Sequence, residues 1–171
     1  GVFTLENLTA IVNPIHFKAV IFSLEVALGC TVLCILLSYP LVMALRHLKL
    51  GKKGISLFIL ILPMWMNFIL RVLALQLILS NNGIINFLLS KVGIGPLVLA
   101  NTWKAIMIGV VYDYFPFMAL PIFNAVSEID VDVIDAARDL GANGWTIFWK
   151  IIVPLSKPGL FSGIVMVFVP S

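Results

Sequence analysis

The chain has 171 residues, of which 61% are hydrophobic and 11% are charged, and its formal net charge is +3. A water-soluble domain carries about 25% charged residues, so a water-soluble monomer is excluded and most of this surface must face lipid. The small positive charge, without a basic run interleaved with aromatic residues, also argues against a nucleic-acid partner.

Long uncharged stretches predict the membrane-spanning segments of an all-α membrane protein. Val26 to Leu45 is a run of twenty uncharged residues, which at roughly 1.5 Å per residue crosses a hydrocarbon core of about 30 Å. The tract Ser80-Asn81-Asn82-Gly83 is a turn signal that ends the second stretch. Three complete spans and a truncated fourth are assigned to residues 18–45, 55–79, 105–126 and 159–171. The chain begins without Met and stops within an apolar run, so we interpret it as a fragment of a single transmembrane domain, 1–171.

The loop between the first two spans sets the predicted orientation. Residues 46–53 contain four Lys and Arg residues, and short basic loops favour the cytoplasmic side. Residues 1–17 and 80–104 are then extracytoplasmic, and residues 127–158 form a second cytoplasmic loop. Since Gly and Pro interrupt 80–104, we expect a short interfacial helix and a loop there.

Two cysteines, Cys30 and Cys34, are four residues apart. This spacing places them on one helix face, where a disulfide is geometrically poor. We expect both to be small packing residues inside a membrane helix.

The 127–158 loop is predicted to hold two short helices around a glycine turn. Asp130 and Asp132 suit the start of the first helix, and Gly141 suits its end. Ile134, Ala137 and Leu140 recur on one face of it. Trp145, Phe148, Trp149 and Ile152 form an amphipathic stripe on the second helix, which Pro154 is expected to end. Such a pair is either a rigid knob that transmits a push or an amphipathic hairpin anchored in the lipid headgroup layer.

The residues of this loop resemble the EAA loop of ATP-binding-cassette (ABC) importer permeases, whose usual form is EAA-x3-G-x9-I-x-L-P. The chain has Asp for Glu and Val for Leu and keeps every spacing. The resemblance predicts the following ATPase-coupling residues in this loop: Asp135, Ala136, Ala137, Leu140, Gly141, Ile151 and Pro154.

The resemblance extends over most of the chain to the spermidine/putrescine-type permeases. It includes the stretch 62–67 followed by Arg71, the segments 109–112 and 115–118, and the segment 136–142. The resemblance implies a type I ABC-importer helical bundle with six spans, of which this sequence holds the second to the fourth and part of the fifth.

The resemblance also implies how transport is energised. A permease of this family has no catalytic residues and binds no cofactor, and ATP is hydrolysed by a separate ATPase subunit. The chain agrees, since it has no GxxxxGK[ST] loop. The expected partners are an ATPase homodimer, a second permease subunit, an extracytoplasmic substrate-binding protein and the lipid bilayer. The expected location is the plasma (cell inner) membrane.

Asp113 is the one charged residue deep in the third predicted span. A membrane-buried acid costs about 2.5–3.5 kcal/mol on insertion scales, so it usually faces a bundle interior. With Tyr112 and Tyr114 it is a candidate for binding a cationic ammonium group, which suits a polyamine. Weaker candidates for the same substrate path are Trp65 and Asn67. The alternative is a structural partnership, for example with Arg71.

Two other functions remain open at this point. The same permease class with iron(III), thiamine, sulfate or phosphonate as cargo shares the EAA loop. A membrane-anchoring or assembly protein would use the amphipathic hairpin as its anchor. An intramembrane enzyme has little support, because one isolated acid and two distant histidines make no nucleophile–base pair.

Overall fold

The computed structural model describes residues 14–47, 58, 60–91, 93, 95, 97–100 and 102–171. The regular elements of these residues are all helical, which confirms the all-α prediction. In chain order they are α2 (Pro14–His47), η1 (Leu62–Trp65), α4 (Phe68–Leu79), α5 (Ile84–Lys91), α6 (Trp103–Ser127), α7 (Val131–Asp139), α8 (Gly144–Ile147), the π-helical turn η2 (Phe148–Ile152), α9 (Val153–Leu155) and α10 (Lys157–Phe168).

Three stretches of the described chain are long and apolar enough to cross a membrane. They are His16–Arg46, Phe68–Lys91 and Trp103–Ser127. A fourth arises only if Gly144–Leu155 and Lys157–Phe168, which meet at an angle of 67°, count as one broken span. Most of the predicted segments 1–17 and 46–53 lies outside the described residues.

The second stretch differs from the predicted span 55–79 at both ends: it begins only at Phe68, because the helix is interrupted before that residue, and it continues past Leu79 to Lys91. Pro63 lies in the 3-10 turn η1, and Met66 has an extended backbone. Asn67 then caps a new helix, since its side chain accepts a hydrogen bond from the Ile69 amide. The short helix expected in 80–104 is α5, which follows the Ser80–Gly83 turn.

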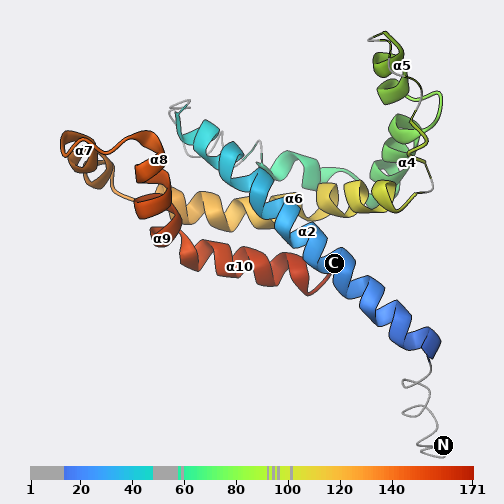
Figure 1. Ribbon diagram of the computed structural model, residues 1–171, viewed down its shortest axis with the longest axis horizontal. Helices are drawn as coiled ribbons and strands as arrows, with labels where there is room; N and C mark the ends of the chain where they lie inside the picture. Colours follow the sequence, from blue (N-terminus) through green and yellow to red (C-terminus); the bar gives the residue numbers. More distant parts are fainter. Residues whose placement is uncertain are drawn as a thin grey trace, which may run out of the picture.

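Helix α6 is the centre of the fold. It packs against both α2 and α10, and Figure 1 shows α10 running beside it while α2 crosses obliquely. The elements α7–α9 lie at one end of this group and α4 and α5 at the other. The buried residues that join the three helices include Cys30 and Cys34, which are fully buried with their sulfur atoms 3.8 Å apart. Their expected role as packing residues is confirmed.

Glycines bring α10 close to α6. A Cβ atom at Gly159 would lie 2.4 Å from the Pro121 carbonyl oxygen, and one at Gly163 would lie 2.7 Å from Met118 Sδ. The two glycines are four residues apart, the small-residue spacing that lets membrane helices approach closely. This pairing holds the last helix against the centre of the fold.

Candidate functional site

The first helix of the 127–158 loop begins and ends as its residues predict. The Asp130 side chain accepts a hydrogen bond from the Asp132 amide at 3.1 Å and caps α7. Gly141 has φ +83°, a backbone conformation that favours glycine. Its amide donates to the Arg138 carbonyl at 2.8 Å, which closes the turn.

The prediction that Leu140 lies on the apolar face of α7 is wrong. Ile134 is buried and Ala137 is half-buried, but Leu140 is 89% exposed. The reason is that α7 ends at Asp139, so Leu140 belongs to the turn and points away from the core. Leu140 and Val133 therefore both present exposed apolar side chains on the loop.

The second half of the loop also departs from the prediction. Pro154 does not end the helix, because a π-helical turn precedes it and the chain stays helical to Leu155. The Val153 amide bonds back five residues to Phe148, and this wider turn accommodates a proline that lacks an amide donor. Because the π turn changes the register, the predicted stripe is split. Ile152 is buried, whereas Trp145 is 72% exposed and packs edge-on against Trp149.

Two contacts attach the base of the loop to α2. Arg46 donates to the carbonyls of Val126 at 2.9 Å and Ile129 at 3.3 Å, at the carboxyl end of α6. Tyr39 lies 3.0 Å from the buried Ser156 hydroxyl, between α9 and α10. The loop is thus firmly held at its base and exposed at its tip.

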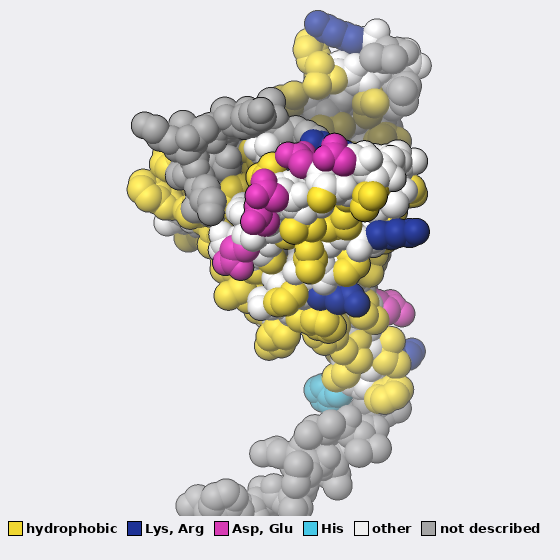
Figure 2. All heavy atoms as spheres, turned by 90° about the vertical axis from the view of Figure 1, so that its left-hand side faces the viewer, with side chains coloured by type: hydrophobic (Ala, Val, Ile, Leu, Met, Phe, Trp, Pro, Cys, Tyr) yellow, Lys and Arg dark blue, Asp and Glu magenta, His cyan; other side chains and the backbone are white. Residues whose placement is uncertain are grey.

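The exposed end of the loop is acidic. Figure 2 looks onto the end that carries α7–α9, and acidic side chains gather there beside apolar ones. Asp135 pairs with Arg138 one turn later at 3.0 Å, with both side chains more than half exposed. Of the other predicted coupling residues, Ala136 is exposed, Ile151 is half-buried and Pro154 is exposed.

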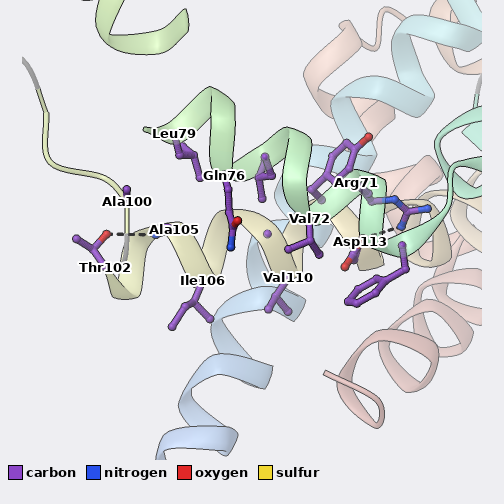
Figure 3. A pocket seen from close by; sticks show the side chains of 14 residues that line it. Arg71, Val72, Gln76, Leu79, Ala100, Thr102, Ala105, Ile106, Val110 and Asp113 are labelled. Carbon is purple, nitrogen blue, oxygen red and sulfur yellow. Dashed lines mark hydrogen bonds and ion pairs between the residues drawn. The ribbon is translucent and has the colours of Figure 1, made fainter. Parts of the chain in front are cut away.

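A second candidate site is a cavity of about 720 Å³ between α4 and α6. Its polar lining comes from Arg71, Gln76, Thr102, Tyr112 and Asp113. In Figure 3, the Arg71–Asp113 pair closes one end of the cavity and Thr102 lies at the other.

The charged end of this cavity is an ion pair between two helices. Arg71 Nη1 lies 2.6 Å from Asp113 Oδ1, and the two side chains are 13% and 23% exposed. The Arg71 guanidinium also lies 5.8 Å from the centre of the Tyr112 ring. The alternative that Asp113 has a partnership with Arg71 is therefore confirmed.

The other proposed substrate-path residues lie elsewhere. Tyr114 donates to the Pro170 carbonyl at 2.9 Å, and Asn67 caps α4. Trp65 is 81% exposed and contacts Phe58. Of the five residues, the cavity brings together Tyr112 and Asp113.

Several residues that shape both sites could not be recognised from the sequence. Arg46 was assigned only to a basic loop. Tyr39 lies in the segment Ser38-Tyr39-Pro40, which is part of the resemblance, but no local pattern indicates its contact with Ser156. Asn86 was also missed, although it is buried and bonds both the amide and the carbonyl of Leu97. Gly159 and Gly163 differ from these residues, because their four-residue spacing in the sequence is itself a sign of close helix packing.

Comparison with known proteins decides the family. Residues 32–171 match the family described as "Binding-protein-dependent transport system inner membrane component". The chain belongs to this family. Together with the apolar helices, this makes it a multi-pass inner-membrane component of a transport system.

Individual relatives agree with the family. The chain is 37% identical to "Spermidine/putrescine transport system permease protein PotB" of Escherichia coli (strain K12), over 99% of the chain and 62% of that protein. For the protein of the same name in Haemophilus influenzae the identity is 35%, over 98% of the chain and 59% of the relative. The "Inner membrane ABC transporter permease protein YdcU" of E. coli is 28% identical over 96% of the chain and 57% of its own length. The chain thus spans about three-fifths of the length of these three relatives, each of which is named as a permease protein.

Proposed function

We propose that the chain is part of the permease subunit of an ATP-driven polyamine importer, working by alternating access. The observation that carries this proposal is the 127–158 loop, whose base is hydrogen-bonded at two points to α2 while its tip is exposed. The relatives named as spermidine/putrescine permeases support the cargo.

In this proposal the loop receives motion from a separate ATPase homodimer. Asp135, Ala136 and Ala137 seat in a cleft of the ATPase, where the small alanines allow close approach. The exposed Leu140 adds apolar contact area. Gly141 keeps the turn sharp, and the Arg46 and Tyr39 contacts pass the displacement into α2 and α6.

The remaining parts of the importer lie outside this chain. A second permease subunit completes the path, an extracytoplasmic binding protein delivers the cargo, and ATP is used only by the ATPase. The loop then lies on the cytoplasmic side. This orientation is tested by placing a cysteine at Asp135 of the full-length protein and labelling intact cells and inverted vesicles. Labelling from the outside of intact cells would refute the coupling role.

Uptake by the complete complex tests the function itself. We expect proteoliposomes that contain the full-length permease and its partners to take up labelled putrescine or spermidine when ATP is supplied. We expect no ATP-dependent uptake of iron(III) or thiamine. Uptake of iron(III) or thiamine instead would keep the permease class and replace the cargo. The exposed Trp145 and Trp149 suit a membrane anchor as well. Failure of the ATPase to co-purify would favour that function.

A further inference from the structure

The carboxylate that best suits a cationic cargo already holds a cation. At the end of the α4–α6 cavity, Arg71 Nη1 lies 2.6 Å from Asp113 Oδ1 and forms an ion pair with it. These are the only two charged side chains among the described residues that line the cavity. An ammonium group that reaches Asp113 through this cavity therefore meets a carboxylate whose negative charge is already paired, and it has to compete with the guanidinium for that charge.

Arg71 has other contacts that can hold it when it leaves Asp113. It donates through Nη2 to the Met66 carbonyl at 3.2 Å, at the break between η1 and α4. Its guanidinium also lies against the face of Tyr112, a favourable position for a cation. Because these contacts do not involve Asp113, releasing the carboxylate does not strand the arginine in an apolar environment.

The rest of the cavity suits a linear molecule with methylene segments between amines. Its volume of about 720 Å³ is within the range of small-molecule sites. Val72, Leu75 and Ile106 supply apolar wall. Gln76 reaches from α4 toward α6, between the Asp113 end of the cavity and the Thr102 end. Its side-chain carbonyl oxygen can accept a hydrogen bond from a second amine of the cargo. Thr102 lies about 16 Å from Asp113 along α6, since eleven residues separate them.

We propose that Arg71 is a tethered counter-ion that competes with the cationic cargo for Asp113. The inference rests on the proposed polyamine import and adds a step to it. Cargo binds by displacing Arg71 from Asp113, and the return of Arg71 to the carboxylate expels the cargo. Because Arg71 and Asp113 belong to different helices, the exchange also changes what holds α4 to α6.

The test separates the two partners of the ion pair by their opposite effects on KM. The full-length permease in its complete complex is reconstituted in proteoliposomes, and KM and kcat are measured for labelled spermidine. Arg71→Gln removes the competitor, so KM falls about tenfold, the low end for one hydrogen bond to a charged group. Its kcat also falls, because nothing expels the cargo. Asp113→Asn raises KM about tenfold.

The double variant and a matched control complete the test. Arg71→Gln with Asp113→Asn keeps the high KM of Asp113→Asn alone, since no carboxylate remains to compete for. Lys91→Gln, which removes a cation that lies over Phe87 outside the cavity, leaves KM unchanged. If Arg71→Gln fails to assemble, Arg71→Lys serves instead. Arg71→Lys keeps the positive charge but binds the Asp113 carboxylate more weakly than arginine does, so its KM falls by less than that of Arg71→Gln.

The outcomes distinguish this inference from the function beneath it. A purely structural ion pair predicts that both single variants lose uptake in the same direction and that the double variant recovers part of it, which would overturn the counter-ion role alone. Spermidine uptake with KM unchanged in both single variants would do the same. A wild-type complex that transports no polyamine would remove the proposed cargo and this inference together.

Discussion

Substitution of Gly159 by alanine tests whether close packing of α10 on α6 holds the fold together. The added Cβ would lie 2.4 Å from the Pro121 carbonyl oxygen and 2.7 Å from Ala125 Cβ. Neither neighbour is the flexible end of a side chain, so the two helices must move apart. Gly163 differs, because its nearest neighbour is the thioether of Met118, which can rotate away.

The magnitude follows from two opposing effects. Replacing glycine by alanine within a helix gains up to about 1 kcal/mol from backbone entropy and propensity. Overpacking a tight contact costs about 1–3 kcal/mol. Gly144→Ala isolates the first effect, because Gly144 lies at the start of α8 and a Cβ there meets no atom within 4 Å. We therefore expect Gly159→Ala to be less stable than Gly144→Ala by about 1–3 kcal/mol.

The assay is the free energy of unfolding of the full-length permease, measured by SDS titration in mixed micelles. The expected order of stability is Gly144→Ala, then Gly163→Ala, then Gly159→Ala. If Gly159→Ala were as stable as Gly144→Ala, α10 would not lie this close to Pro121, and the packing described above would be wrong.

Further substitutions test the base of the loop, its glycine turn and the contact between α5 and Leu97. Tyr39→Phe removes the buried hydrogen bond to Ser156 and should lower the free energy of unfolding by about 1 kcal/mol; Tyr114→Phe, which loses an exposed bond, should cost less. Gly141→Ala places a residue with a Cβ atom at φ +83°, which costs about 1–2 kcal/mol. ATP-driven uptake should therefore fall. Membrane insertion, measured by the amount of protein in the membrane fraction, should not change. Asn86→Ala removes the acceptor of the Leu97 amide, so hydrogen exchange of that amide should become faster. Unchanged exchange would contradict the Asn86–Leu97 hydrogen bond.

Local features of the 127–158 loop could be predicted because they depend on neighbouring residues. The Asp130 cap and the Gly141 turn require only the side chain and the backbone within a few positions. Leu140 could not be placed this way, since its exposure depends on where α7 ends. The π turn before Pro154 likewise depends on how Ile152 packs against the core, which no helical period reveals.

For Asp113 in the cavity, the sequence predicts only two alternatives: binding a cationic group of the cargo or a partnership with another residue such as Arg71. An acid in the middle of a span indicates an interior role, but Arg71 and Asp113 are 42 residues apart, and their contact is set by the packing of α4 on α6. Tyr114, a neighbour of Asp113 in sequence, lies on another side of α6 and bonds near the chain end. Adjacent residues of a helix point in different directions, so sequence proximity did not group the site.

Helix α6 joins the two candidate sites, and its prolines decide how motion can pass between them. Arg46 binds the Val126 carbonyl at one end, about 20 Å along the helix from Asp113. Pro116 and Pro121 lie between these points and each removes a backbone donor, so α6 alone would bend rather than move as a rod. The contact of Gly159 with Pro121 lies on this weak segment. A tightly packed α10 therefore braces α6 where it is weakest, and loosening Gly159 should impair coupling as well as stability.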